Sequence, residues 1–219
     1  MSATDITPET FVETMLRHVP FDGWTEMAMQ TTAEELGLSA SDVAKLFPRG
    51  FESLISIGSN DVDAKMVAEF MARFADRFDE MPVHIKIREL LLIRFEILQP
   101  YKEAVRKMVA FLAQPSHAKI GTGPVYNTLD RVWRAAGDRS TDINFYTKRA
   151  MLAAVYGSTM LAFLDDNTHD MAKTRAFLDR RLKDVANVPK LTKPLRSAAS
   201  MLGGMVNNLA NMRGRKPGQ

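Results

Sequence analysis

The spacing of the apolar residues is the feature that most constrains the fold of this chain. Apolar side chains recur at intervals of three and four from end to end, whereas the alternation typical of a half-buried strand is not sustained anywhere. The sequence has no cysteine, and no apolar run approaches the roughly 18 residues that a membrane-spanning helix needs. It therefore predicts an all-α protein whose core contains neither disulfides nor Cys-based metal sites.

The first fifty residues carry the start and stop signals of three short helices. Thr7 followed by Pro8 is typical of a helix start, and Gly37 is typical of a helix end. Ser39 with Asp42 three residues later indicates a reciprocal capping box. Three short helices at this spacing predict a helix-turn-helix, with helices expected at about residues 8–18, 24–36 and 39–47.

Longer helices are expected in the rest of the chain, separated by segments rich in proline and glycine. The first of them contains the sequence "GSND" at residues 58–61, which suggests an interruption of the helix. We expect residues 1–50 to form a helix-turn-helix part continuous with a helical part at 51–186, followed by a linker and amphipathic helix at 187–219. The helices are expected at about residues 50–78, 82–99, 100 onward, 125–136, 142–164, 170–185 and 195–212.

Charge is distributed unevenly along the chain. Residues 1–60 carry 3 basic and 9 acidic side chains, a net charge of −6, whereas residues 171–219 carry 11 basic and 2 acidic ones, a net charge of +9. The segment between them is neutral. This asymmetry predicts different partners for the two ends of the chain.

A search for catalytic constellations gives negative results. The sequence has no Glu-x-x-His pair for a di-iron site in a helical bundle and no phosphate-binding loop. Ser116 and Lys119 match the bare Ser-x-x-Lys pattern, but they stand in a Pro/Gly-rich segment without its companion motifs. We therefore expect no catalytic residues, no metal ligands and no cofactor.

The stretch from Ala33 to Phe47 resembles the DNA-binding signature of the TetR family. Where that family presents an aromatic and a basic side chain to phosphates, this sequence has Ala44, Lys45 and Leu46. Because phosphate contacts supply most non-specific affinity for DNA, a segment at −6 would be repelled. We expect the fold without nucleic-acid binding. The scaffold positions that match are Ala33, Gly37, Leu38, Ser39 and Phe47.

A second resemblance is more specific. Residues 136–156, "AGDRSTDINFYTKRAMLAAVY", together with "FDGWTEMAMQTTAEELGLS", are similar to the ninth coenzyme-Q biosynthesis protein family. The similarity covers about residues 8 to 186 in the same order along the chain. It also includes an amphipathic C-terminal helix. Phe145 stands where the mitochondrial members have tryptophan, which keeps an aromatic ring but removes the indole donor.

This resemblance implies a TetR-like helical bundle that is not an enzyme. Members bind isoprenoid lipids in a hydrophobic pocket, form homodimers, contact the membrane through the last helix and dock onto the di-iron hydroxylase that acts on demethoxy-ubiquinone. The implied function is to present an isoprenoid quinone precursor to that hydroxylase. The rival interpretations are a ligand-responsive TetR-type transcriptional regulator and a small isoprenoid-processing enzyme.

The N-terminal charges bear on location. Asp5, Glu9 and Glu13 precede the first basic residue, Arg17, whereas secretory and mitochondrial leaders are basic at this end. We expect a bacterial-type cytoplasmic protein, peripheral on the inner membrane, or a matrix-side protein if the sequence is a mature organellar form.

Helical geometry groups the candidate partner-binding residues on one face of the helix expected at 142–164. At 100° per residue, Asp142, Phe145, Tyr146 and Arg149 fall within one patch, with Tyr156 close by, while the opposite and mostly small side is expected to pack on a neighbouring helix. Two aromatic residues flanked by charges are typical of an interaction hot spot. The alternative is that both rings pack on the preceding segment. The predicted partner-binding residues are Trp133, Asp142, Phe145, Tyr146 and Arg149, and the predicted packing side is Thr147, Ala150, Met151, Ala154 and Ser158.

Two further sets of candidates come from apolar positions. A dry cavity between the central helices would suit a polyisoprene tail, which needs volume and no polar partner. The basic C-terminal segment has an apolar seam that favours attachment to an anionic membrane, the alternative being a bundle contact. The expected lipid-binding residues are Phe70, Phe74, Leu91, Phe95, Leu129 and Met151, and the expected membrane-binding residues are Lys193, Leu195, Arg196, Leu202, Met205 and Leu209.

Overall fold

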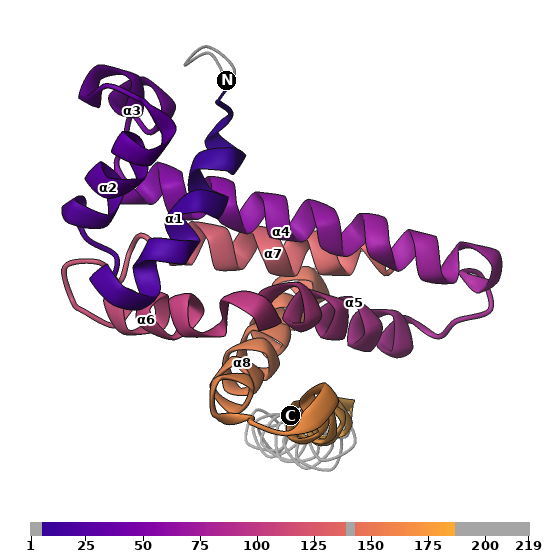
Figure 1. Cartoon of the computed structure of the whole chain (residues 1–219). Helices are drawn as coiled ribbons and strands as arrows, with labels where there is room; N and C mark the ends of the chain where they lie inside the picture. The colour runs from indigo at the N-terminus through magenta and orange to yellow at the C-terminus, as the bar shows by residue number, and fades with distance from the viewer. Residues whose placement is uncertain (1–5, 139–142, 187–219) are drawn as a thin grey trace, which may run out of the picture. The chain divides into compact units, whose positions relative to one another are not determined.

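The computed structural model describes residues 6–138 and 143–186, with the side chains of 143–146 excepted. It divides the chain into two compact units, Met1–Leu178 and Asp179–Gln219. Every regular element in the described residues is helical, so the all-α prediction is confirmed (Figure 1).

The first three helices begin and end largely at the predicted signals. They are α1 (Pro8–Asp22), α2 (Glu26–Leu36) and α3 (Ala40–Leu46). The Thr7 hydroxyl accepts a hydrogen bond from the backbone N–H of Thr10 at 3.2 Å, and Ser39 and Asp42 form the expected capping box. Gly37 ends α2 in the left-handed conformation, with φ of 68°.

One boundary prediction was wrong, because α1 continues past His18 to Asp22 with Pro20 inside it. A proline removes one backbone hydrogen bond from a helix, but the fully buried Val19 packs in the core beside it and holds the last turn. The helix ends at Gly23, whose positive φ of 73° suits glycine and whose N–H reaches the Val19 carbonyl at 2.9 Å.

The helix that follows, α4 (Phe51–Phe74), has no break near Gly58, contrary to the possibility raised by the sequence. A Cβ at Gly58 would lie 2.9 Å from a methyl carbon of Val12 in α1. Glycine is therefore needed here for the close approach of α1 and α4. The later elements are η2 (Ala75–Arg77), α5 (Val83–Leu98), η3 (Gln99–Tyr101), α6 (Lys102–Leu112), α7 (Thr122–Ala135), α8 (Ile143–Asp165) and η4 (His169–Met171), followed by helical residues 172–186.

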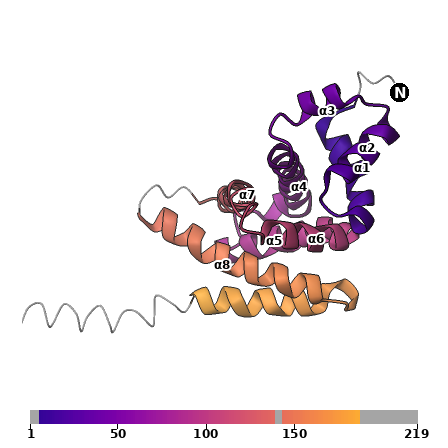
Figure 2. The same cartoon turned by 90° about the vertical axis from the view of Figure 1, so that its left-hand side faces the viewer.

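Within the first unit, α4 packs against α1, α5 and α7, and α7 also contacts α5 and α8. Figures 1 and 2 show α1, α2 and α3 gathered at the end of α4 where that helix begins, and α1 also contacts α6. The helix-turn-helix part is therefore joined to the rest of the unit mainly through α1.

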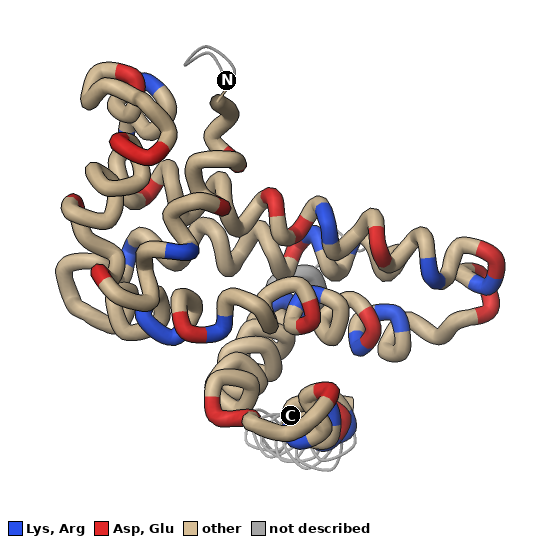
Figure 3. The backbone as a smooth tube through the Cα atoms, in the orientation of Figure 1, with Lys and Arg blue, Asp and Glu red and all other residues tan. Residues whose placement is uncertain are grey.

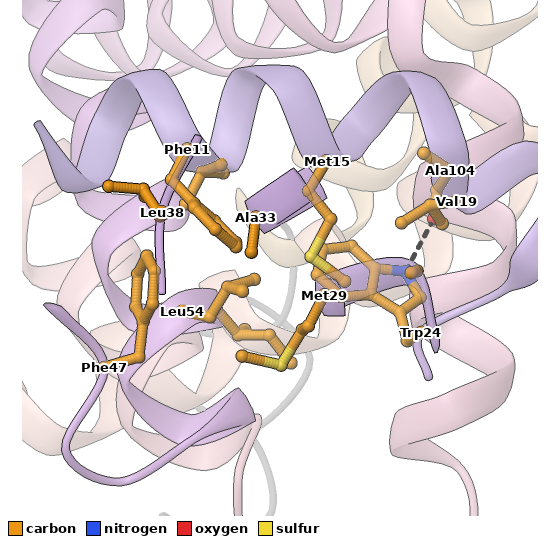
Figure 4. Close-up of a cluster of buried hydrophobic side chains, with 13 residues drawn as sticks. Phe11, Met15, Val19, Trp24, Met29, Ala33, Leu38, Phe47, Leu54 and Ala104 are labelled. Carbon is orange, nitrogen blue, oxygen red and sulfur yellow. Dashed lines mark hydrogen bonds between the residues drawn. The ribbon is translucent and has the colours of Figure 1, made fainter. Parts of the chain in front are cut away.

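A cluster of buried apolar side chains forms the junction between these parts (Figure 4). Phe11 lies against Phe47 with ring centroids 4.9 Å apart, which joins α1 to the end of α3. The Trp24 indole N–H donates to the Ala104 carbonyl at 3.1 Å and so links the start of α2 to α6. Leu54 of α4 is fully buried in the same cluster.

Asp166 organises the turn that follows α8. Its carboxylate accepts hydrogen bonds from the backbone N–H and the hydroxyl of both Thr168 and Thr174. Burial raises the pKa of Asp166, but these four hydrogen bonds outweigh that effect and hold its pKa well below the usual range. The ionised carboxylate therefore stabilises the fold.

We expect Asp166→Asn to lower the free energy of unfolding by about 2 kcal/mol at neutral pH, because an amide leaves part of this donor set without an acceptor. Since the folded pKa is depressed, the contribution is present above the unfolded value of about 3.9 and is lost as the pH falls below it. Urea denaturation across this pH range should show the gap between the two proteins closing in acid. Asp165→Asn, at the exposed neighbouring position, is the control, and a gap independent of pH would contradict the assignment.

Candidate ligand-binding cavity

A cavity of about 130 Å³ lies among α1, α4, α5, α6, α7 and α8. About ten water molecules would fit in it, and ten waters occupy roughly 300 Å³ in the liquid. The cavity therefore lies at the lower end of the size range of small-molecule sites. Its walls are mainly aliphatic. They include Val12 and Leu16 of α1, Leu54, Ile55 and Val62 of α4, Ile97 and Leu98 of α5, Val105, Met108 and Leu112 of α6, Val125 of α7 and Met160 of α8.

Four polar side chains in the wall, Ser59, Arg94, Thr128 and Tyr156, belong to one hydrogen-bond network, which we call the polar floor together with Asp63 behind it. Arg94 Nε donates to Asp63 Oδ1 at 2.8 Å, and its Nη1 donates to the Tyr156 hydroxyl at 2.8 Å. Its Nη2 lies 3.1 Å from the Ser59 hydroxyl. The Thr128 hydroxyl donates to the other oxygen of Asp63 at 2.8 Å. The polar floor thus connects α4, α5, α7 and α8.

Burial determines the electrostatics of the polar floor. Arg94 is 5% exposed and Asp63 is fully buried, so each charge depends on the other for compensation. Burial raises the pKa of Tyr156, and neighbouring Arg94 only partly offsets that effect. Tyr156 is therefore a neutral phenol near neutral pH and can donate a hydrogen bond.

The other charged residues of the wall lie near solvent. Glu9, Glu13 and Lys65 are exposed, and Lys65 pairs with Asp61 at 2.7 Å. These residues belong to α1 and α4, which places a charged rim where these two helices border the cavity.

This arrangement suits binding better than catalysis. An apolar space with hydrogen-bond donors at one place in its wall can hold an amphiphilic molecule and orient it. In the described part of the chain, no three His, Cys, Asp or Glu side chains are grouped to hold a metal ion. Ser116 and Lys119 are exposed on the segment between α6 and α7 and do not line the cavity.

The six residues predicted to contact lipid lie outside the cavity wall. Phe70 and Leu91 are fully buried, and Phe70 packs on Phe74 with ring centroids 5.2 Å apart. Phe95 is also fully buried and stacks behind Tyr156 at 5.9 Å. Leu129 is buried and Met151 is half-buried. These positions form packing layers, and lipid contact at any of them stays a prediction.

The predicted orientation of α8 was wrong. The side expected to pack, with Thr147, Ala150 and Ala154, is exposed, and the helix instead buries Leu152, Tyr156 and other residues of the opposite side. Small residues do not by themselves mark a packed face, because burial of large apolar groups contributes more free energy. The buried side of α8 carries Arg149, Leu152, Tyr156, Thr159, Met160 and Phe163.

Arg149, predicted to be an outward partner-binding residue, is therefore corrected as well. Its side chain is 5% exposed and binds Asp130 of α7 through Nε at 3.0 Å and Nη2 at 2.5 Å. Trp133 is half-buried, and Lys148 Nζ lies 5.4 Å from the centre of its ring. Asp142 and the side chains of Phe145 and Tyr146 lie outside the described residues, so their role in partner binding stays a prediction.

The polar floor was missed in the sequence. The sequence did contain a signal, because Arg94 stands between the apolar residues Leu90–Ile93 and Phe95. A charge buried in such a segment needs a partner of opposite charge. Its partner Asp63, 31 residues earlier, could not be found without the packing of α4 on α5. The predicted membrane-binding residues, from Lys193 to Leu209, lie outside the described part of the chain.

Fold and cavity together define a TetR-like helical protein with an internal apolar cavity. A solved structure of a TetR transcriptional regulator from Nitrosomonas europaea is similar with a TM-score of 0.65 and 22% identity, covering 82% of this chain and 97% of that one. This likeness confirms the TetR-like fold. None of the described helices is both long and apolar enough to traverse a bilayer.

Sequence comparison finds similarity to COQ9 proteins over most of the chain. The COQ9 family model matches residues 120–189. The ubiquinone biosynthesis protein COQ9, mitochondrial, of Homo sapiens is 30% identical over 85% of this chain and 60% of its own length. The protein of the same name from Drosophila melanogaster is 32% identical over 81% of this chain and 54% of its own length. The predicted resemblance to this family is confirmed. The chain spans about three fifths of the length of these relatives.

The buried pair of the polar floor should be essential for stability. We expect Asp63→Ala to lower the free energy of unfolding by about 3 to 5 kcal/mol, because it leaves the Arg94 charge buried without a partner. The double change Asp63→Leu with Arg94→Met should lower the free energy of unfolding by less than Asp63→Ala does, because it removes both charges together. Removing Lys65 from its exposed pair with Asp61 should cost about 1 kcal/mol or less. Chemical denaturation measures all three, and additive losses in the double variant would contradict the coupling.

Proposed function

We propose that this protein is a non-enzymatic, lipid-binding accessory factor of ubiquinone biosynthesis. In this proposal it takes up an isoprenoid quinone precursor and presents it to the demethoxy-ubiquinone hydroxylase that the family resemblance implies. The observation that carries the proposal is an apolar cavity whose wall contains one hydrogen-bonded polar cluster. The ubiquinone biosynthesis named for the relatives supplies the pathway.

The physical fit is between the aliphatic wall and a polyisoprene tail. Such a tail gains free energy from leaving water, about 25 cal/mol for each Å² of apolar surface buried, and needs no directed contact. The cavity has room for a small ring and the nearest part of a tail, and a longer tail would continue past the rim. Arg94 and Asp63 bind each other, so neither charged group is free to act as an acid or base at this point of the wall, which favours carriage over chemistry.

A cavity-filling substitution tests lipid binding. We expect Val62→Phe to reduce the lipid that co-purifies with the full chain to less than half, because the larger ring occupies space that Val62 leaves open in the wall. Val67→Phe is the matched control, since Val67 is also half-buried on α4 but does not line the cavity. Mass spectrometry of extracted lipid, beside a thermal melt, gives the result. Equal losses in both variants, or none, would contradict binding in this cavity.

Membrane attachment, dimerisation and location are further parts of the proposal. The excess of basic residues in 171–219 favours binding to an anionic membrane surface. Each Lys or Arg close to such a surface contributes on the order of 1 kcal/mol to the binding free energy. We propose that the C-terminal segment brings the protein to the membrane as a peripheral homodimer, in agreement with the family resemblance. The relatives are named as mitochondrial, and for this chain we propose the cytoplasmic face of an inner membrane.

We propose docking of the hydroxylase at the junction of α7 and α8. Double replacement of Phe145 and Tyr146 by Ala should abolish capture of the hydroxylase. Replacing an interface aromatic residue by Ala typically weakens the binding free energy by about 2 kcal/mol or more. If the rings instead pack in the core, each Phe-to-Ala change would cost about 3 to 5 kcal/mol of stability. One pull-down beside one thermal melt separates these outcomes. Arg149→Ala is not a suitable variant for this test because it would also leave Asp130 without its buried partner.

The second candidate function is a ligand-responsive transcriptional regulator, which the fold of the Nitrosomonas europaea protein favours. The charges of the helix-turn-helix oppose it. Helix α2 carries Glu26, Glu34 and Glu35 and no basic residue, so its charged positions are acidic (Figure 3). On α3, Lys45 Nζ lies 3.4 Å from Asp42 Oδ1. A helix pair with this balance offers little to phosphates. A salt-sensitive mobility shift with sub-micromolar specific affinity would favour the regulator.

A further inference from the structure

We infer that the polar floor is a head-group subsite that selects neutral, oxygen-bearing heads and excludes carboxylates and phosphates. This inference rests on the proposed function, because it assigns the orientation and the chemical class of the molecule that the cavity takes. The ligand would be a neutral ring with a carbonyl, ether or hydroxyl oxygen, joined to an apolar tail. Tyr156, Arg94 and Ser59 would contact the ring oxygens.

The first argument is the supply of donors in the cavity wall. The Tyr156 oxygen accepts from Arg94 at 2.8 Å, so its own hydrogen remains to be donated, and no acceptor within the described residues receives it. The Ser59 hydroxyl, which accepts from Arg94 at 3.1 Å, is half-buried and also lines the cavity. Its own hydrogen faces the Thr128 hydroxyl over a long distance of 3.4 Å, so it can turn toward a ligand that offers a better acceptor. Donors grouped in an otherwise apolar wall suit a ligand that brings acceptor oxygens.

The second argument is charge. The Arg94 guanidinium is already balanced by Asp63 at 2.8 Å, so the polar floor has no net positive charge to offer an anion. An anionic head would add an uncompensated charge in a region shielded from water, which is costly. A neutral oxygen accepts a hydrogen bond there without that penalty.

The charged rim strengthens this selection. Three carboxylates, those of Glu9, Glu13 and Asp61, line the cavity, against a single lysine, Lys65, which is paired with Asp61 at 2.7 Å. An anionic head that enters beside these residues meets mainly like charge. A neutral head passes the rim, and the tail then lies along the aliphatic walls with the head at Tyr156.

The geometry of the polar floor is fixed from behind. Phe95 stacks on the Tyr156 ring at 5.9 Å, and Thr128 holds the second oxygen of Asp63 at 2.8 Å. The donors are therefore positioned before a ligand arrives, and binding does not have to order them. Such preorganisation raises the affinity for a matching head, because less entropy is lost on binding, and a head without acceptor oxygens leaves these donors unpaired.

The test compares three probes that share a farnesyl tail, using the purified full chain. Binding is measured by quenching of the tryptophan fluorescence, since Trp24, one of the two tryptophans, lines the cavity. The probes are farnesyl-1,4-benzoquinone, farnesyl-4-hydroxybenzoate and a farnesyl hydrocarbon without a polar head. We expect the quinone to bind about tenfold tighter than the carboxylate at neutral pH and tighter than the hydrocarbon. Calorimetry replaces fluorescence for any probe that absorbs at the wavelengths of tryptophan emission.

Two variants assign this preference to the polar floor. Tyr156→Phe and Ser59→Ala should each weaken quinone binding by about fivefold and leave hydrocarbon binding unchanged, because only a hydroxyl is removed. Tyr126→Phe and Ser41→Ala, at exposed positions outside the cavity wall, are the matched controls. A thermal melt checks that each variant is folded. If Tyr156→Phe does not fold, Ser59→Ala and the comparison of the three probes still test the head-group subsite.

The outcomes separate the inference from the proposed function. Failure of all three probes to bind the unmodified chain would overturn the proposed function itself. Equal binding of quinone, carboxylate and hydrocarbon, or tighter binding of the carboxylate, would overturn the head-group subsite while leaving lipid binding intact. A quinone preference that survives both hydroxyl deletions would overturn the assignment to the polar floor.

Discussion

The ion pair between Arg94 and Asp63 is the interaction on which the rest of the first unit depends. It joins α5 to α4, and through Thr128 and Tyr156 it adds α7 and α8, so four helices meet at one buried pair. Burying two charges is expensive, and the cost is offset only when their remaining hydrogen-bonding groups are also satisfied. The pair therefore fixes the relative positions of these helices more narrowly than apolar packing would, because a shift of any one of them breaks a directed contact.

The cavity follows from the same constraint. Helices held at fixed positions by a polar cluster cannot collapse freely onto one another, and at Gly58 the approach of α1 to α4 is already as close as Val12 permits. Space remains between α1, α6 and the four helices of the pair, and its walls are aliphatic because each helix turns an apolar side inward. The polar floor is thus both part of the framework that keeps the cavity open and part of the cavity wall.

The sequence predicted what is decided locally and missed what is decided by packing. The caps at Thr7 and Ser39 and the turn at Gly37 are short-range hydrogen-bonding and backbone effects, and all three were predicted correctly. The first helix was expected to end at about His18, although the burial of Val19 continues it to Asp22. The inverted orientation of α8 and the position of Phe70 and Leu91 outside the wall of this cavity have a common cause. Core and cavity wall use the same apolar side chains, and only the arrangement of several helices distinguishes them.

The position of the cavity also links the two ends of the first unit. Trp24 lines the cavity while its indole N–H binds the Ala104 carbonyl of α6, and Leu54 belongs both to the cavity wall and to the core cluster beneath the helix-turn-helix. A molecule in the cavity would therefore contact the side chains that join α1 and α2 to the rest of the unit. Because a ligand that binds only the folded form stabilises whatever it contacts, occupancy should tighten this junction. The same tightening would reach the end of α3, because Phe11 of α1 packs on Phe47 within this core cluster.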